Sequence, residues 1–489
     1  MSRRLAVVGS GYVGTVVAAC FAHVGHRVVG IEADPEKLVQ LSSGSAPFHE
    51  PGLDPLIAEG IEVGRLSFSG DLGNAMQDSE IVVVCVGTPL GGDGLPDMSA
   101  MEEVAVIVGD TLMRHQVIVT KSTVPVGTGR WMSSLIEERI AMRDEHQGIR
   151  SPATSKLPTS RQARTFSIVS NPEFLREGNA VQDFLHPDRV VIGSDDPAAL
   201  DLVVETYRPV LDQQIPGDAG QRHPVPLVKT SLATAEMSKY ASNSFLATKV
   251  SFANEIARLC ELVGADVTDV MAGIGLDSRI GNHFLDAGVG WGGSCLGKDL
   301  TALMTTAAEY GYRARILEAA REVNESQRQH VVDELLRHLK TLRGARICMF
   351  GLAFKPETDD VRDSPGLDIA KRLSSRGAFV KAHDPMVQRV PGSGEIRTFA
   401  DPIAAARGAD AVVITTDWPQ FLAMDLVHLR QVTRGDVFFD GRNIFNPREV
   451  ESAGFHYIGI GRPSHTQHTG ARDPAEAISG VVSSRRGER

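Results

Sequence analysis

The sequence predicts an α/β protein with two doubly wound parallel sheets, joined by a central helical domain that contains a long helix. Near the N-terminus, short runs rich in valine and isoleucine alternate with stretches of helical periodicity, which is typical of strands covered on both faces. Residues 231–263 then form a long stretch without glycine or proline. From residue 345 the alternation of strand and helix starts again. Two such α/β segments separated by helical sequence indicate two sheets and a connecting helical domain.

The strands of the first sheet follow from apolar runs bounded by glycine or polar residues. They are expected at residues 4–9, 27–32, 80–87, 116–122 and 189–194. After the long helix at 231–263, a second long helical stretch is expected within about 299–341. In the second sheet, strands are expected at 346–354, 379–385, 409–416 and 436–443, with a helix at 364–377. This segment therefore resembles a smaller copy of the first one.

Composition limits the class of protein. The chain has 489 residues, which is too many for one core, and 42% of them are hydrophobic and 23% charged, as in ordinary globular proteins. A formal net charge of −11 disfavours nucleic-acid binding, although arginines and backbone amides can still bind a small anion. No apolar run approaches the roughly 18–20 residues of a membrane span, and the N-terminus is no signal peptide.

The cysteines indicate the compartment. There are five, at positions 20, 85, 260, 295 and 348, and they form no CxxC pair or metal-type cluster. Scattered cysteines in odd number are typical of reduced thiols in a cytosolic protein. We therefore expect a cytoplasmic protein without a metal site.

A glycine-rich turn follows the first predicted strand. In "GSGYVG", Gly9 permits the tight turn, Gly11 lets a pyrophosphate approach the backbone, and Gly14 lets the helix pack close to the sheet. The second strand ends in Glu32, at the distance where an acid binds the ribose hydroxyls and repels a 2′-phosphate. The alternative is a structural turn beside a solvated glutamate. The context favours a dinucleotide site that takes NAD rather than NADP.

The segment "GGSCLGKDLTAL" contains the most suggestive cysteine. Cys295 is expected just before or at the start of a helix, where unpaired backbone N–H groups favour a thiolate. Lys298 adds positive charge, and Asp299 shares a helical face with Cys295 if the helix has begun. This set suits covalent catalysis, in which sulfur adds to a carbonyl carbon and water later hydrolyses the adduct. The alternative is a small buried cysteine with Lys298 and Asp299 solvated.

Further polar residues lie near strand ends. Lys121, Ser122 and Thr123 are expected at the C-terminal end of a strand, where open α/β sheets bind ligands. Glu173 and Glu177 are expected near another strand end. All of these side chains are equally compatible with a position at the surface in contact with solvent.

Two other segments carry polar residues in suggestive positions. Lys239 and Asn243 are four residues apart and share one helical face. Lys355 and Arg362 lie in a strand–loop–helix segment that could bind phosphate through backbone amides. The alternative for these residues, too, is a position at the surface in contact with solvent.

Together these motifs are identified as those of the UDP-glucose/GDP-mannose 6-dehydrogenase family. The resemblance runs from near residue 5 to about residue 462 and rests on "GSGYVG", "EPGL", "VGTP", "KSTVPVGT", "NPEFLREG", "HPDRVVIG", "KYASNSF", "RIGNHFL", "GGSCLGKD", "GLAFKPETDDVRDSP" and "DGRNIF". Members of the family oxidise the C6 alcohol of a nucleotide sugar to the carboxylate, with two NAD⁺ and no free aldehyde. The resemblance implies the same chemistry here.

The resemblance also implies roles for individual residues. The implied catalytic residues are Cys295 (thiohemiacetal and thioester), Lys239 (oxyanion), Asn243, Asp299 and Thr123 (water) and Glu173 (acid/base). The implied NAD contacts are Gly9, Gly11, Tyr12, Val13, Gly14, Glu32, Lys37, Thr88, Thr123, Glu177, Lys298 and Arg362. The implied substrate contacts are Glu173, Phe174, Leu175, Lys239, Asn243, Arg279 (across a dimer interface), Phe284, Gly288, Gly292, Phe354, Lys355 and Arg442.

With the resemblance, the domain organisation can be stated. We expect an NAD-binding Rossmann-like domain at 1–225, a central helical dimerisation domain at 226–330, and a Rossmann-like domain that binds the nucleotide sugar at 331–463. Residues 464–489 lack apolar periodicity and are expected to be a disordered tail. The expected partners are a small nucleotide sugar and a second copy of the chain, and neither nucleic acid nor membrane.

The substrate implied by the resemblance is UDP-glucose, which would be oxidised to UDP-glucuronate. GDP-mannose is the main alternative, and the "RNIF…YIGIGR" ending is more similar to UDP-glucose enzymes. Ser294 precedes the cysteine, where dehydrogenases of N-acetylated sugars usually carry histidine. A catalytically silent NAD-binding redox sensor and an alcohol dehydrogenase that stops at the aldehyde are the alternatives from other classes.

Some positions depart from the family pattern. Glu32 stands where aspartate is common, and Gly297 replaces the frequent proline before the Lys-Asp pair. Asp286 lies in the loop implied to contact the nucleotide, where a negative charge is unexpected near a diphosphate. The segment 144–165 is rich in Ser, Thr, Pro and Arg and predicts a long surface loop.

Overall fold

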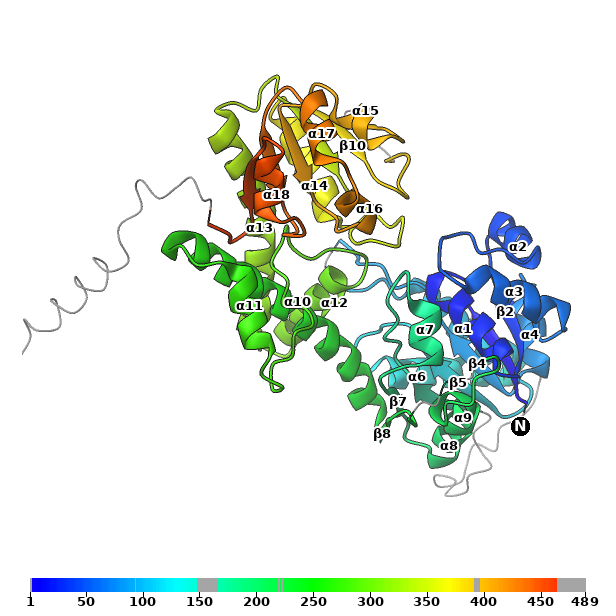
Figure 1. Cartoon of the computed structure of the whole chain (residues 1–489). Helices are drawn as coiled ribbons and strands as arrows, with labels where there is room; N and C mark the ends of the chain where they lie inside the picture. The colour runs from blue at the N-terminus through cyan, green and yellow to red at the C-terminus, as the bar shows by residue number, and fades with distance from the viewer. Residues whose placement is uncertain are drawn as a thin grey trace, which may run out of the picture. The chain divides into compact units, whose positions relative to one another are not determined.

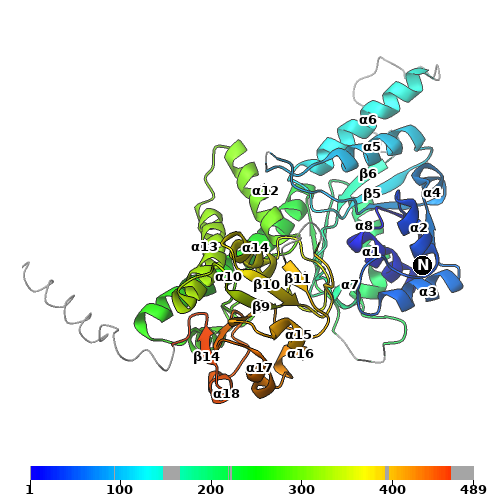
Figure 2. The same cartoon turned by 90° about the horizontal axis from the view of Figure 1, so that it is seen from above.

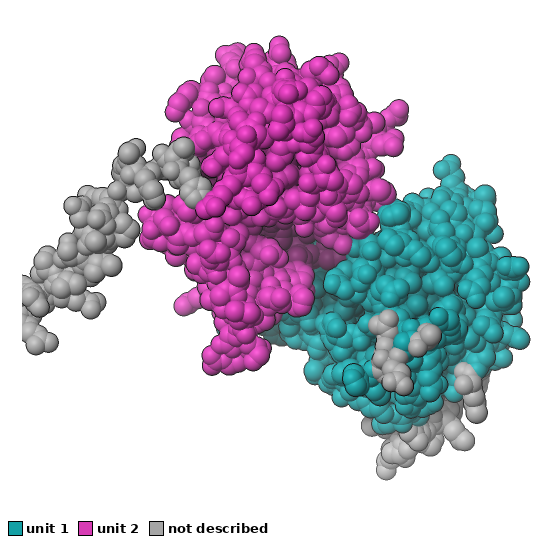
Figure 3. Space-filling view, viewed as in Figure 1, with its two compact units in different colours: residues 1–243, 298–313 teal, residues 244–297, 314–489 magenta. Residues whose placement is uncertain are grey.

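The computed structural model of the chain describes residues 2–92, 94–146, 166–218, 220, 223–390 and 396–463. The chain divides into two compact units (Figure 3). Unit 1 comprises Met1–Asn243 and Lys298–Arg313, and unit 2 comprises Ser244–Gly297 and Ala314–Arg489. The chain passes between them three times: inside α10 (Leu232–Val263), inside α12 (Leu296–Glu309), and between Arg313 and Ala314, after α12 has ended. The expected tail at 464–489 and most of the expected loop at 144–165 lie outside the described residues.

Unit 1 contains an eight-stranded sheet with the order β3-β2-β1-β4-β5-β6-β7-β8. Its strands are β1 (Arg4–Val8), β2 (Arg27–Ile31), β3 (Leu66–Ser69), β4 (Ile81–Val84), β5 (Gln116–Thr120), β6 (Phe166–Ser170), β7 (Val190–Gly193) and β8 (Leu227–Thr230). Its helices, besides parts of α10 and α12, are α1 (Tyr12–His23), α2 (Pro35–Ser42), α3 (Leu53–Glu62), α4 (Leu72–Asp78), α5 (Ser99–Thr111), α6 (Thr128–His146), α7 (Ala180–Leu185), α8 (Pro197–Thr206) and α9 (Arg208–Leu211).

Helices cover both faces of this sheet (Figure 1). Leu5 and Val7 of β1 pack in one apolar cluster with residues of α1, α7 and α8, and Ala6 and Val8 pack in another with residues of α4, α5 and α6. Figure 2 shows α5 and α6 side by side in the second layer. Burial on both faces explains why these strands are apolar without alternation, as the sequence predicted.

One pair of strands departs from the predicted parallel sheet. Among the described strands of unit 1, β6 and β7 are antiparallel, with Ser170 opposite Gly193. The segment between these strands contains only the short helix α7, and β7 starts at the edge where β6 ends. The chain therefore needs no crossover to the opposite edge, which a parallel strand would require.

Unit 2 contains a six-stranded sheet with the order β11-β10-β9-β12-β13-β14, and its described strand pairs are parallel. The strands are β9 (Arg346–Phe350), β10 (Phe379–His383), β11 (Ile396–Thr398), β12 (Ala411–Ile414), β13 (Val437–Asp440) and β14 (His456–Gly459). The helices, besides parts of α10 and α12, are α11 (Val267–Gly275), α13 (Arg315–Leu339), α14 (Pro365–Ser375), α15 (Pro402–Ala406), α16 (Pro419–Leu422), α17 (Leu426–Val432) and α18 (Pro447–Ser452).

The prediction of two doubly wound sheets and a long helix is confirmed, with local corrections. The expected helical stretch within 299–341 is two helices, because α12 ends at Glu309 and α13 begins at Arg315. Gly311 lies between them with φ +71°, a conformation that ends a helix. The sequence also missed β3, β8, β11 and β14, which are only three or four residues long. Residues 144–146, expected in a loop, end helix α6. None of the described helices combines the length and the apolar character needed to cross a bilayer.

Candidate active site

The glycine-rich turn of unit 1 has the geometry expected of a dinucleotide site. Gly9 adopts φ +90°, and α1 begins at Tyr12. A Cβ on Gly14 would lie 1.9 Å from the carbonyl oxygen of Gly9, so only glycine allows this packing of helix against strand. At Gly11 a Cβ would meet nothing within 4 Å. The space at the helix N-terminus is therefore open, as an approaching pyrophosphate requires.

Other residues expected around the cofactor lie near this turn or on the same sheet. Glu32 directly follows β2, and its Oε1 accepts a hydrogen bond of 2.9 Å from the Asp34 N–H. The Thr88 hydroxyl donates to the Thr123 carbonyl at 2.8 Å, which joins the segments after β4 and β5. Lys37 lies in the first turn of α2. Val13 packs beside the core of unit 1.

Glu50 was given no role from the sequence, but it links the glycine-rich turn to a second segment of unit 1. The Tyr12 hydroxyl donates a hydrogen bond to the Glu50 carboxylate. The same carboxylate accepts from the N–H groups of Gly178 and Ala180, both at 2.7 Å. Gly178 directly follows Glu177, so this buried acid attaches the segment after β6 to the start of α1. The sequence feature that could have identified Glu50 is its place in the "EPGL" motif.

A buried ion pair lies at the carboxyl edge of the unit 1 sheet. Lys239 Nζ of α10 lies 2.9 Å from Glu173 Oε1, and the two side chains are 4% and 7% exposed. Burial alone would raise the pKa of Glu173, but the Lys239 charge and a 2.7 Å hydrogen bond from the Leu175 N–H hold that pKa below its ordinary value. Glu173 is therefore ionised at neutral pH and can accept a proton.

Aromatic and cationic groups surround this pair. The Phe174 ring centroid lies 3.7 Å from Arg189 Cζ and 5.4 Å from Lys239 Nζ. Lys121, directly after β5, is buried and donates to Asn171 Oδ1 at 3.1 Å and to the Tyr207 hydroxyl at 3.0 Å. The segment from Glu173 to Leu175 thus lies in a region rich in positive charge. Sequence reasoning gave Arg189 no role of its own and included it only within the "HPDRVVIG" motif.

A second buried polar set lies one turn further along α10. Asn243 Nδ2 donates to Asp299 Oδ2 at 2.6 Å. Lys298 Nζ lies 2.7 Å from Asp299 Oδ1, and the Asp299 side chain is almost wholly buried. This contradicts the alternative in which Lys298 and Asp299 are solvated. A fixed carboxylate and amide in a buried site can hold a water molecule in one orientation.

Cys295 directly precedes α12, which confirms its expected place at a helix start. It is exposed, whereas the other four cysteines are buried. Its Sγ lies 3.5 Å from Ser294 Oγ. Burial raises the pKa of the Cys85 thiol to about 12 and raises the pKa values of Cys20 and Cys348 as well. Cys295 is therefore the thiol that a substrate in solution can reach.

In unit 2, two expected substrate residues are in contact. Arg442 donates from Nη2 to the Phe354 carbonyl at 3.2 Å and from Nε to the Thr415 carbonyl at 2.8 Å. The Phe354 ring lies against Gly293, where an added Cβ would come within 2.8 Å of it. Lys355 follows Phe354 in the same loop, between β9 and α14. These contacts bring the loop beside the segment that leads to Cys295.

The remaining expected residues lie apart from these contacts. Gly288 donates its N–H to Asn254 Oδ1 at 2.8 Å, and Gly292 packs against the backbone of Asp363. Phe284 has a left-handed backbone with φ +62°. Arg279 and Arg362 are exposed and form ion pairs with Asp277 and Asp360.

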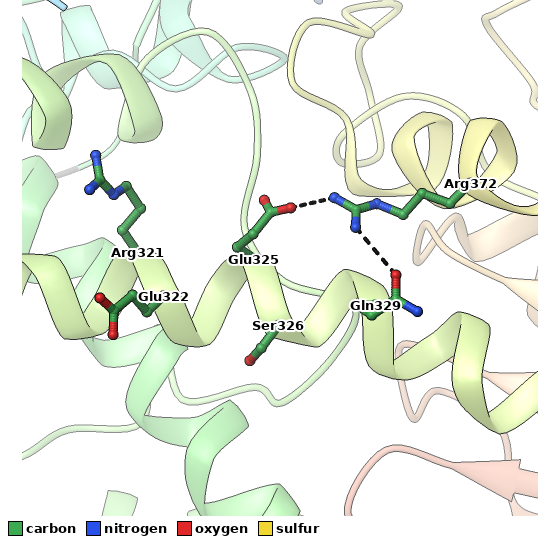
Figure 4. Close-up of a pocket in the computed structure, with 6 residues that line it drawn as sticks. All are labelled: Arg321, Glu322, Glu325, Ser326, Gln329 and Arg372. Atoms are coloured by element: carbon green, nitrogen blue, oxygen red, sulfur yellow. Dashed lines mark hydrogen bonds and ion pairs between the residues drawn. The ribbon is translucent and has the colours of Figure 1, made fainter. Parts of the chain in front are cut away.

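A separate hollow of about 450 Å³ lies between α13 and α14 (Figure 4). It is lined by Arg321, Glu322, Glu325, Ser326, Gln329 and Arg372. Arg372 reaches across it to Glu325 and to Gln329 (Figure 4). None of the expected site residues lines this hollow.

The sequence matches the three domain models of one family along most of its length. These are the NAD binding domain (residues 3–211), the central domain (233–326) and the UDP binding domain (348–447) of the UDP-glucose/GDP-mannose dehydrogenase family.

Individual relatives agree with this match. The chain is 42% identical to UDP-glucose 6-dehydrogenase TuaD of Bacillus subtilis over 467 residues, which cover 94% of each protein. It is 40% identical to a UDP-glucose 6-dehydrogenase of Pseudomonas aeruginosa, over 94% of this chain and 98% of that protein. A UDP-glucose dehydrogenase structure from Pyrobaculum islandicum is similar with a TM-score of 0.82 and 36% identity, over 94% of this chain and 98% of that one. The chain therefore belongs to the UDP-glucose/GDP-mannose dehydrogenase family.

Proposed function

We propose that this protein oxidises the C6 alcohol of UDP-glucose to the carboxylate of UDP-glucuronate. The relatives named above act on UDP-glucose and align with almost the whole chain. The observation that carries the proposal is the arrangement on α10, where Lys239 pairs with Glu173 and Asn243 bonds to Asp299 in buried surroundings. A two-electron alcohol dehydrogenase would have no use for the exposed thiol of Cys295. GDP-mannose is the alternative substrate.

The glycine turn of unit 1 fits NAD, because Gly9 and Gly14 pack closely and the space at Gly11 is open. When bound, NAD⁺ accepts the hydride in each of the two oxidations. We propose that it is held by Gly9, Gly11, Tyr12, Val13, Gly14, Glu32, Lys37, Thr88, Thr123, Glu177, Lys298 and Arg362. Glu32 would accept hydrogen bonds from the ribose hydroxyls and disfavour NADP.

The chemistry of the chain's own residues then follows in steps. Cys295 sulfur bonds to the carbonyl carbon of the aldehyde formed by the first oxidation, and the carbonyl oxygen takes up a proton in the thiohemiacetal. The second oxidation removes a hydride and that proton and leaves a thioester. Water attacks the thioester carbon, the C–S bond breaks, and Cys295 leaves as a thiolate.

Buried charges support the addition steps. The Lys239 ammonium would stabilise the oxyanion that forms at each addition, and a fixed charge in a dry site costs no reorganisation at that moment. Asn243, Asp299 and Thr123 would orient the attacking water. Glu173, held ionised by Lys239, would take its proton. Keeping the aldehyde bonded to sulfur retains it until a second NAD⁺ has bound.

We propose further contacts for the nucleotide sugar. The sugar would lie against Glu173, Phe174, Leu175, Lys239 and Asn243, and the nucleotide would contact Arg279, Phe284, Gly288, Gly292, Phe354, Lys355 and Arg442. The domain division at 1–225, 226–330 and 331–463 is likewise a proposal, supported by the matched ranges of the family models.

We propose a homodimer or larger homo-oligomer because α10 exposes a row of apolar side chains. Phe245, Phe252 and Leu259 are exposed and recur every seven residues, so they form one apolar stripe along the helix. A second copy of the chain would cover this stripe, and Arg279 would then reach a substrate across the interface. A cytoplasmic location is proposed because the five cysteines, all in the described part of the chain, form no disulfide with one another.

A panel of sugar nucleotides tests the activity. Purified protein should reduce two NAD⁺ for each UDP-glucose consumed, with much slower reduction for GDP-mannose and UDP-N-acetyl sugars. A ratio of one NADH per sugar would contradict the four-electron reaction. Faster turnover of GDP-mannose than of UDP-glucose would overturn the substrate assignment alone.

A further inference from the structure

A buried carboxylate organises the loop that follows β9 in unit 2. Asp384 directly follows β10 and is 4% exposed. Its Oδ2 accepts hydrogen bonds from Leu352 N (2.7 Å), Ala353 N (3.0 Å) and Trp418 Nε1 (3.2 Å), and its Oδ1 accepts from Met386 N (2.9 Å) and Val387 N (3.0 Å). Hydrogen bonds to a charged acceptor are stronger than neutral ones, so this carboxylate fixes the backbone on both sides of it.

The loop held in this way carries Phe354. The carbonyl of Ala353 accepts a 2.7 Å hydrogen bond from the buried Thr416 hydroxyl. The next carbonyl, of Phe354, accepts from Arg442. Consecutive peptide groups are thus fixed by Asp384, Thr416 and Arg442, and the Phe354 ring is held against Gly293.

This contact leads to the proposed nucleophile. Gly293 has φ +87°, and an added Cβ would lie 2.8 Å from the Phe354 ring, so the ring and the backbone are in close contact. Cys295 follows Gly293 by two residues. A displacement of the Phe354 ring would therefore change the space beside the segment that carries the thiol.

The matching position in unit 1 is used differently. Both sheets place an acid directly after the second strand, Glu32 after β2 and Asp384 after β10. Gly9 and Gly351 are also equivalent, since each follows the first strand and donates its N–H to the last carbonyl of the second strand, at 3.0 and 2.9 Å. Glu32 is partly exposed, whereas Asp384 is buried and directed at the backbone of the loop.

We propose that Asp384 is a positioning residue for the nucleotide sugar. It acts through the backbone of Leu352 and Ala353, which sets the place of the Phe354 ring beside Gly293. The inference rests on the proposed function, in which Phe354 contacts the nucleotide sugar and Cys295 is the nucleophile. It adds a residue that touches neither substrate nor cofactor.

The main test compares Asp384→Asn with Asp410→Asn. The amide of Asp384→Asn keeps the size of the side chain but turns a donor toward backbone N–H groups. Asp410 is the control for a buried carboxylate elsewhere in the sheet, because it accepts a 2.9 Å hydrogen bond from the Arg346 N–H and forms an ion pair with Arg434. It directly precedes β12 and so lies at the amino-terminal ends of the strands, whereas Asp384 lies at their carboxyl-terminal ends. The readouts are melting temperature and the dissociation constants for UDP-glucose and NADH.

Asp384→Asn should weaken UDP-glucose binding at least tenfold and leave NADH binding within twofold. Asp410→Asn should lower the melting temperature but leave both constants within twofold. Thr416→Val removes only the hydrogen bond to the Ala353 carbonyl, and it should weaken UDP-glucose binding about threefold, which provides a milder variant if Asp384→Asn does not fold. Wild-type affinity in both Asp384→Asn and Thr416→Val, or equal weakening in Asp410→Asn, would overturn the inference.

A second readout does not depend on the substrate. The rate of Cys295 alkylation by iodoacetamide should change at least threefold in Asp384→Asn and Thr416→Val and stay unchanged in Asp410→Asn. If the wild-type protein neither binds nor oxidises UDP-glucose, the proposed function fails while alkylation still decides the role of Asp384. Unchanged alkylation in both loop variants would refute that role even where UDP-glucose is turned over.

Discussion

Lys239 Nζ and Glu173 Oε1 lie 2.9 Å apart, and both side chains are almost completely buried. The two residues come from a helix and from the segment after a strand that are far apart in the sequence. A buried charge that loses its partner is strongly destabilising, because the remaining charge cannot recover its hydration. This pair therefore ties the stability of unit 1 to the same side chains that are proposed for catalysis.

The first prediction concerns Lys239→Met. It leaves the Glu173 carboxylate buried without its cation, and we expect a loss of about 3–5 kcal/mol in the free energy of unfolding. The double variant with Glu173→Gln should lose less than the sum of the single losses. Urea denaturation of the wild type, the two single variants and the double variant measures this coupling. Additive losses would show that the interaction between the two side chains contributes nothing to the free energy of unfolding.

The second prediction concerns pH. The pKa of Glu173 is lowered in the folded protein, chiefly because the Lys239 pair and hydrogen bonds outweigh burial. A lowered carboxyl pKa contributes stability above the unfolded value, about 4.3, and loses it as the pH falls through the folded value. The stability difference between the wild type and Glu173→Gln should be constant near neutral pH and shrink below pH of about 4.3. Urea midpoints across this range test it, and a difference that grows on acidification contradicts it.

The third prediction concerns Asn243→Asp. Asn243 Nδ2 lies 2.6 Å from Asp299 Oδ2, so the variant would bring two buried carboxyls together. Like charges at this distance raise the pKa of one of them. We expect a fall in kcat of roughly 100-fold at pH 7, about 2.7 kcal/mol in barrier. Because a raised carboxyl pKa costs stability as the pH rises, the variant should also become less stable than the wild type at higher pH.

The fourth prediction concerns Cys295→Ala. The variant should bind NADH with unchanged affinity but form no UDP-glucuronate, because no sulfur holds the aldehyde. Cys260→Ala, which changes a buried thiol, should keep its turnover. Product analysis by mass spectrometry separates the outcomes. Uronate formation by Cys295→Ala at a near-normal rate would remove the covalent step.

The fifth prediction concerns the apolar stripe of Phe245, Phe252 and Leu259 on α10. Phe252→Glu places a charge in the middle of the stripe and, if the proposed oligomer forms through it, should sediment as a monomer in sedimentation velocity. Met113→Glu is the control, because it makes the same kind of change at another exposed apolar position. An unchanged sedimentation coefficient for Phe252→Glu would show that the stripe is not the interface.

Much of the fold follows from local sequence patterns. The run from Arg4 to Ile31 contains a strand, a glycine turn, a helix and a strand, and each has its own periodicity, so the prediction needed no distant contacts. The antiparallel β6–β7 pair could not be predicted in this way. Its direction depends on the edge at which the chain returns to the sheet, and strand composition does not encode that edge.

The candidate site shows the same limit. The sharing of one helical face by Lys239 and Asn243 follows from their spacing of four residues. Their partners, Glu173 and Asp299, could be singled out but not paired with them. Asp384 escaped notice because it accepts hydrogen bonds mainly from backbone N–H groups, which every sequence supplies and no motif marks.

The repeated strand order of the two sheets has a practical use in interpreting variants. Strand β1 corresponds to β9, β2 to β10 and β4 to β12, so positions on these strands have counterparts in the other sheet. Gly14 and Gly366 are an example: an added Cβ would lie 1.9 Å from the Gly9 oxygen in one case and 3.0 Å from the Gly351 oxygen in the other. A newly observed substitution can thus be judged against its internal counterpart, within one polypeptide, before a second protein is consulted.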